Sequence, residues 1–81
     1  MNKLINIGYE NSVNIDKVIT IMNYGSLTAK RMLKKAKEKE LLIDATEGNK
    51  TLSILITDSG NVIKSAVKAE TLRKRCEKIN K

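Results

Sequence analysis

Residues 41–48 read Leu-Leu-Ile-Asp-Ala-Thr-Glu-Gly, an apolar strand pattern that runs directly into a tight turn. Asp44 and Thr46 carry short polar side chains that bond nearby backbone groups and end a strand. Gly48 allows a positive φ at little cost. The segment therefore predicts a buried strand over Leu41–Ala45, followed by a rigid loop from which the chain turns back into another strand.

A helix with one apolar face is predicted before this strand. Ala29, Met32, Leu33 and Ala36 recur at the spacing of a single helical face. Ser26 precedes them and is a favourable N-cap. Good helix formers fill the segment through residue 40.

The order of elements predicts one α+β domain over residues 1–81, with a small, mainly antiparallel sheet and two helices. Residues 58–61, Asp-Ser-Gly-Asn, form a strong turn signal and predict a hairpin between the strands on either side. An open sheet leaves unpaired edges that invite pairing with another chain. The predicted order β-β-α-β-β-β-α comprises strands at 3–7, 13–22 (best over 18–22, with a bulge near residue 16), 41–45, 52–56 and 62–67, with the last helix at 69–79.

The formal charge of +7 is distributed unevenly along the chain. Residues 30–40 and residues 68–81 each carry six cations and two anions, and both stretches coincide with predicted helices. Solvation of a helix face explains any single lysine. Solubility alone does not require so much charge of one sign, so a polyanionic partner is the better explanation.

Composition argues against an enzyme and against a metal site. The chain has one cysteine and no histidine. Ser-His and Cys-His nucleophiles are therefore excluded within one chain, and a zinc site is not expected. Cys76 falls on the apolar stripe of the last helix and is interpreted as a small packed side chain. Asp44 and Asp58 fit turn roles better than an acid–base pair. No cofactor or small-molecule substrate is predicted.

The chain is expected to be cytoplasmic. Its N-terminus does not read as a signal peptide, because Asn6 and Gly8 interrupt the apolar run. No apolar stretch approaches the roughly 20 residues needed to cross a bilayer, so no membrane partner is expected. A single unpaired thiol suits a reducing compartment.

Several blocks of residues together resemble one protein family. Besides the 41–48 turn, they are Leu4-Ile5-Asn6-Ile7-Gly8, Lys30-Arg31-Met32, Ser65-Ala66-Val67 and Glu70-Thr71. Over residues 3–75 the chain resembles the RemA family of extracellular matrix regulatory proteins, which are small bacterial DNA-binding regulators. The resemblance implies a fold related to the LytTR DNA-binding type and a ring-shaped homo-oligomer of about eight subunits. It also implies that duplex DNA wraps on the ring.

The resemblance implies four DNA-contact candidates. In relatives the loop after the turn is rich in arginines that contact DNA; here Lys50 is the one cation kept at those positions. Asn49 occupies a matched position and could donate to a phosphate or a base edge. Lys17 stands where the family has an arginine and keeps the charge without the planar fork. Arg31 lies in a matched block, where it either binds DNA or braces a neighbouring subunit.

The resemblance thus implies a regulator of biofilm matrix genes, and the positive charge fits DNA binding mainly through phosphates. Specificity would then come from repeated weak contacts and DNA deformability more than from base readout. Two alternative functions would explain the same positive charge. One is an RNA-binding ring, against which the presence of only two aromatic residues counts. The other is a basic protein-interaction or assembly module that meets an acidic protein.

Overall fold

The computed structural model describes residues 3–79, which form six strands and two helices. The prediction of an α+β fold with two helices is confirmed. The elements are β1 (Leu4–Gly8), β2 (Asn11–Asn14), a short 3₁₀ helix η1 (Ile15–Lys17), β3 (Val18–Asn23), α1 (Leu27–Glu38), β4 (Leu42–Asp44), β5 (Ser53–Thr57), β6 (Val62–Ser65) and α2 (Ala69–Ile79).

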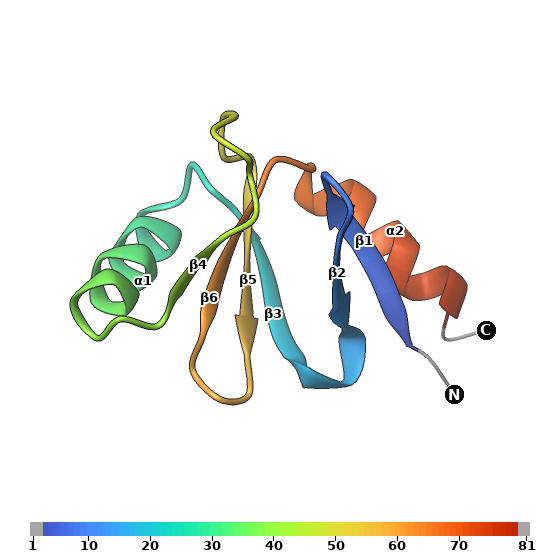
Figure 1. Cartoon of the computed structure of the whole chain (residues 1–81), viewed down its shortest axis with the longest axis horizontal. Coiled ribbons are helices and arrows are strands. Elements are labelled where there is room, and N and C mark those ends of the chain that lie inside the picture. Colours follow the sequence, from blue (N-terminus) through green and yellow to red (C-terminus); the bar gives the residue numbers. More distant parts are fainter. Residues whose placement is uncertain (1–2, 80–81) are drawn as a thin grey trace.

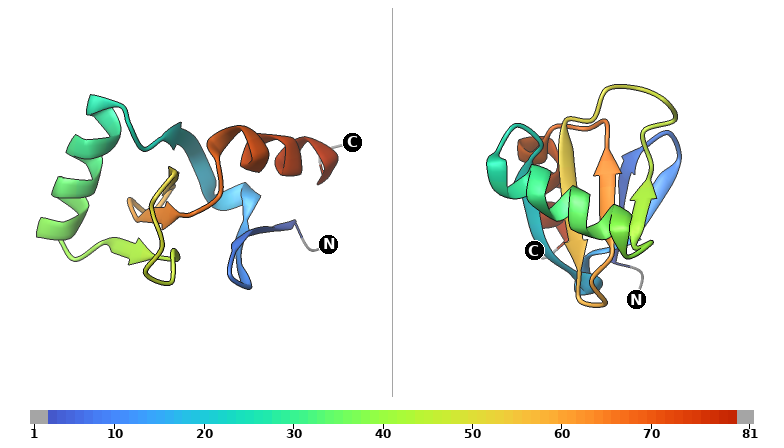
Figure 2. Two further views of the ribbon diagram at one scale, coloured as in Figure 1. Left: turned by 90° about the horizontal axis from the view of Figure 1, so that it is seen from above. Right: turned by 90° about the vertical axis from the view of Figure 1, so that its left-hand side faces the viewer.

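The strands form two sheets instead of one. The larger sheet has the order β3-β5-β6-β4, and a separate two-stranded sheet pairs β1 with β2. Helix α1 lies on one face of the larger sheet, while α2 and the β1-β2 sheet lie on the other (Figures 1 and 2). A sheet covered on both faces needs strands that are apolar on both sides.

Strand β5 meets this need and contributes to two separate hydrophobic clusters. Leu55 packs with β1, β6 and α2, in a cluster that includes Ile7 and Leu72. Ile54 and its neighbour two residues on, Ile56, pack on the other face against α1. The alternation of strand side chains therefore divides the core into two thin layers.

The prediction of a strand over residues 13–22 is partly correct: its best part, 18–22, lies within β3, but the strand does not continue back to residue 13. The chain leaves β2 at Asn14, makes the 3₁₀ turn η1 and enters β3, which belongs to the other sheet. The Asn14 side chain accepts a hydrogen bond from the Asp16 N–H at 2.9 Å and caps this turn. The predicted bulge near Asp16 is therefore a corner between two sheets, and the fold has one strand more than predicted.

The expected sequence of neighbouring hairpins is only partly correct. The hairpin between β5 and β6 is confirmed: these strands pair antiparallel, and Gly60 in the turn has a φ of +89°. Strand β4, however, does not pair with β5. It pairs in parallel with β6, from Leu42 opposite Val62 to Asp44 opposite Lys64. The sheet is mainly antiparallel, as predicted, with this one parallel edge.

Helix α1 begins and ends at defined signals. The predicted cap is confirmed, because the Ser26 hydroxyl accepts a hydrogen bond from the Ala29 N–H at 3.0 Å. The helix ends at Glu38, two residues before its predicted end. Glu40 adopts a φ of +59°, and the Leu41 N–H then bonds the Ala36 carbonyl at 2.8 Å. This backbone arrangement closes a helix and redirects the chain into the next strand.

We expect Leu72→Ala to destabilise the fold by about 2–5 kcal/mol, because Leu72 is fully buried and its truncation leaves a cavity. Urea unfolding measures this change. Leu27→Ala is the matched control, since Leu27 is 74% exposed and its truncation should cost no more than about 0.5 kcal/mol. Equal stability of the two variants would contradict the packing of α2 described above.

Candidate nucleic-acid interface

The turn after β4 is held by the residues that the sequence singled out. Both the backbone N–H and the hydroxyl of Thr46 donate to Asp44 Oδ1, at 2.9 and 2.6 Å. Thr46 is itself buried. Glu47 and Gly48 follow with φ values of +51° and +80°, so the chain reverses in the left-handed region. The predicted rigid turn is confirmed.

These hydrogen bonds also set the protonation behaviour of Asp44. Its pKa lies below the usual 3.8, first because the Thr46 hydroxyl donates to the carboxylate and then because the Thr46 N–H does. Lys64, whose Nζ lies 3.7 Å from Asp44 Oδ2, lowers the pKa further. The turn is therefore stabilised by a charged Asp44, which is an anchor of the loop and not a catalytic acid.

Asn49 is used to shape the loop. Its side-chain amide donates to the carbonyls of Thr46 at 3.1 Å and Glu47 at 3.4 Å. The donors that a phosphate would need are therefore turned back towards the loop. Lys50, the next residue, is exposed. A DNA contact by Asn49 stays a prediction, and its observed contacts give it a role in positioning Lys50.

Leu52 ties this loop to the segments that lead into both helices. Its carbonyl accepts a hydrogen bond from the Tyr24 N–H at 3.1 Å, and its N–H donates to the Ser65 carbonyl at 2.8 Å. Strands β3, β4 and β6 all finish at this end of the sheet, which we call the loop end (Figure 1). The N-termini of α1 and α2 lie at the loop end as well.

The loop end is a favourable place for an anion. Lys30, Arg31, Lys50 and Lys68 are exposed on the loop or near the helix N-termini. The first turn of α1 contains no acidic residue, so nothing there offsets the positive end of the helix dipole. Glu47 lies on the same loop and offsets part of this charge.

Lys17 lies at the opposite end of the sheet, which we call the hairpin end. Its carbonyl accepts a hydrogen bond from the Asp58 N–H at 2.8 Å, beside the turn between β5 and β6. Strand β3 separates it from the loop end and is six residues long, which corresponds to about 20 Å. The structure therefore does not bring Lys17 and Lys50 together, and the two lysines cannot contact the same phosphate.

The two basic helices differ in how their cations are engaged. On α2, Lys74 pairs with Glu70 at 3.5 Å, and Arg75 donates to the Asn6 carbonyl at 2.7 Å. Within residues 3–79, no cation of α1 forms a salt bridge. Arg31 follows the buried Ala29 by two residues, about 200° round the helix, and so faces away from the sheet. The α1 cations are therefore available to an anionic partner.

Relatives with names that describe regulation match nearly the whole chain. One from Thermodesulfovibrio yellowstonii is 47% identical over 78 residues, which cover 96% of this chain and 92% of that protein. Another, from Fervidobacterium nodosum, is 53% identical over 72 residues, which cover 89% and 77%. The model of the family described as extracellular matrix regulatory protein A-like, or RemA-like, matches residues 4–76. The chain belongs to the RemA-like family. The resemblance seen in the sequence is thereby confirmed.

In this RemA-like chain the structure also defines what sequence reasoning missed. The loop end depends on two backbone hydrogen bonds of Leu52 to residues far away in the sequence, and the identity of an apolar residue does not reveal such bonds.

Between residues 3 and 79 no helix is both long and apolar enough to cross a membrane. In the same part of the chain, no three cysteine or carboxylate side chains gather as a metal site would require.

We expect Thr46→Val to raise the pKa of Asp44, because the variant lacks the hydroxyl that favours the carboxylate. NMR titration of the Asp44 carboxyl measures this shift. The lowered pKa stabilises the fold above pH 3.8, and that contribution disappears as the pH falls through the pKa of the folded state. The pH-dependent part of the variant's destabilisation should therefore vanish in acid. Thr46→Ser keeps the hydroxyl and should titrate like the wild type.

Proposed function

We propose that this RemA-like protein is a transcriptional regulator that binds duplex DNA as a homo-oligomer and wraps it through phosphate contacts. Membership of a family named for regulation of the extracellular matrix supports a regulatory role. A net charge of +7 on 81 residues supports a polyanionic partner. Expression of matrix genes is the output that the family name suggests.

The loop end carries the proposal. Lys50 projects there from a loop that is fixed by Asp44, Thr46 and the amide of Asn49. Because the loop backbone is already fixed, a contact with phosphate would order the Lys50 side chain without the further cost of ordering the loop. The N-terminus of α1, without an acidic first turn, adds a second favourable point for an anion. Lysine and helix-terminus contacts read the backbone and not the bases.

Each copy offers few contacts, so assembly matters for affinity. Binding of one subunit raises the effective concentration of the others at the same DNA, and weak contacts add up. Lys17, about 20 Å from the loop end along β3, would meet a different part of the wrapped duplex. Bending costs a sequence-dependent deformation energy, which gives site preference without base contacts.

Salt dependence tests the class of partner. We expect duplex DNA binding to weaken with a slope of about −0.9 in log K against log salt for each phosphate contacted. Titrations of duplex DNA, single-stranded DNA and RNA at several salt concentrations measure this slope. A flat slope, or a preference for single-stranded RNA, would overturn the proposal and favour an RNA-binding or protein-binding role.

Charge removal tests the residues. Lys50→Ala and Lys17→Ala should each weaken binding to all DNA sequences and reduce the salt slope by about 0.9 for each phosphate that the variant no longer binds. Lys74→Ala is the matched control, because Lys74 already pairs with Glu70 on α2 and its removal should leave DNA binding unchanged. If both test variants bind like the wild type while the control behaves as expected, these lysines are not the contacts.

Arg31→Ala requires two measurements, since Arg31 is exposed on α1 and makes no ion pair within residues 3–79. We expect weaker DNA binding with an unchanged molecular mass by light scattering. A smaller mass would assign Arg31 to contacts between subunits instead.

A further inference from the structure

The two outer strands of the larger sheet each expose an isoleucine. Strands β3 and β4 terminate the sheet, and within residues 3–79 no other strand pairs with their outer edges. Ile19 on β3 is 66% exposed and Ile43 on β4 is 47% exposed. Natural sheets usually protect such edges with charged residues or proline, and this chain contains no proline.

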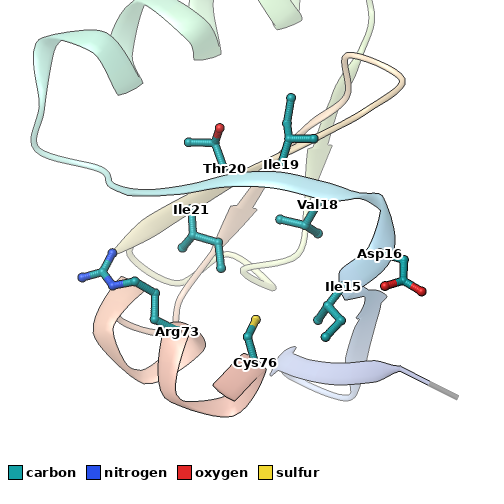
Figure 3. Close-up of a pocket in the computed structure, with 8 residues that line it drawn as sticks. All are labelled: Ile15, Asp16, Val18, Ile19, Thr20, Ile21, Arg73 and Cys76. Carbon is teal, nitrogen blue, oxygen red and sulfur yellow. The ribbon is translucent and has the colours of Figure 1, made fainter. Parts of the chain in front are cut away.

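Beside β3 the surface is hollowed on the face that carries α2. Ile15, Val18 and Ile21 point towards this helix (Figure 3). The lining also includes Asp16, Ile19, Thr20, Arg73 and Cys76. The hollow has a volume of about 330 Å³. Ile19 points to the opposite face, at a register shift in the pairing of β3 with β5. The β3 edge thus has, on one face, a hollow with apolar side chains inside it and charged residues at its border, and on the other face the apolar side chain of Ile19.

The β4 edge has the matching feature. Leu42 packs in the cluster beneath α1, whereas Ala45 packs in the cluster on the α2 face. Because strand side chains alternate, Ile43 points to the same face as Ala45. If the β4 of one molecule continued the sheet of another beyond its β3, Ile43 would lie on the face of the hollow.

Strand direction permits this join. Strand β3 is antiparallel to β5, β5 is antiparallel to β6, and β6 is parallel to β4. Strands β3 and β4 therefore run in the same direction at opposite edges of the sheet. A head-to-tail contact between identical subunits in one orientation would pair them in parallel, and such contacts form rings when the rotation closes.

Charge favours the pairing of β4 with β3 of another copy over a symmetric contact between two β4 edges. Residues 40–48 carry Glu40, Asp44 and Glu47 and no cation, in a chain that is strongly basic. Lys64 already pairs with Asp44, so a contact between two β4 edges would mainly bring Glu40 and Glu47 of one copy towards those of the other. The hollow beside β3 is bordered by two exposed charged residues, Arg73 and Asp16. Asp16 already pairs with Lys3 at 3.5 Å, whereas Arg73 forms no salt bridge within residues 3–79. Opposite charges across an interface favour the correct partner and suppress the wrong one.

We propose that the occupant of the β3 hollow is a second copy of this chain, with its β4 edge paired in parallel to β3 and its Ile43 seated beside Ile21 and Cys76. The inference rests on the oligomeric part of the proposed function and names the interface. Because all copies in such an assembly share one orientation, every copy places its loop end on the same rim. Repeated loops on one rim are what multivalent phosphate binding requires.

Two edge variants test the interface. Ile19→Asp should disable the β3 edge and Ile43→Asp the β4 edge, so each alone should lower the mass from the oligomer to the 9.1 kDa monomer in light scattering at micromolar concentration. Leu27→Asp is the control: Leu27 is 74% exposed, lies on α1 and not on a sheet edge, and its substitution should leave the oligomer intact. Circular dichroism checks folding, and serine replaces aspartate at any site where the aspartate variant unfolds.

Mixing the two variants separates this interface from a symmetric one. The Ile19→Asp variant keeps a β4 edge and the Ile43→Asp variant keeps a β3 edge, so the mixture should form a dimer of twice the monomer mass. A mixture that stays monomeric would overturn the head-to-tail pairing. An oligomer that survives both substitutions would do the same, while leaving the oligomeric regulator standing.

Failure of the interface and failure of DNA binding give different experimental results. If the wild type is itself a monomer, both the interface and the oligomeric part of the proposed function fail. Duplex binding by that monomer, with the expected salt slope, would still support the DNA-binding part. If the monomeric variants bind duplex DNA more weakly than the oligomer with the same preference over RNA, the loop end is the contact and assembly supplies the avidity.

Discussion

The whole structure depends on β5, because its side chains enter both hydrophobic clusters. Leu55 packs towards α2 and the small sheet, while Ile54 and Ile56 pack towards α1. Val62 and Ile63 of β6 extend the same two clusters, so the adjacent strands β5 and β6 form the surface that both helices cover. The cost of the arrangement is two thin cores in a chain of 81 residues, which buries only about 60% of its unfolded surface. Apolar residues on the sheet edges are left over, and burial between copies would add the stability that each core lacks.

Much of the fold could be predicted because it is specified locally. The Ser26 cap, the hairpin turn at Gly60 and the Asp44–Thr46 turn all depend on side chains within a few residues of the backbone they bond. The corner between β2 and β3 was missed because apolar residues continue through it. The Asn14 side chain, which caps the turn, was the available signal. The parallel pairing of β4 with β6 had none, because strand alternation does not encode strand direction.

The candidate site, too, could be predicted only where it is specified by neighbouring residues. The sequence indicated a rigid loop with Lys50 at its tip, and the loop has the predicted bonds. It could not show that Asn49 turns its amide donors inwards, or that Lys17 lies at the far end of β3. Such positions depend on the register between strands far apart in the chain. The pairing of cations on α2, and the absence of ion pairs on α1 within residues 3–79, are likewise results of packing.

The charge of the chain raises one objection to assembly, and the placement of the charges answers it. Subunits of +7 repel each other, and at physiological ionic strength exposed charges are screened only beyond about 8 Å. The contact proposed here avoids the worst of this repulsion. The acidic residues Glu40 and Glu47 beside β4 would face an edge bordered by Arg73, while the cations of α1 form no salt bridge within residues 3–79. DNA that binds these cations would neutralise the remaining repulsion, so DNA binding and assembly should strengthen each other.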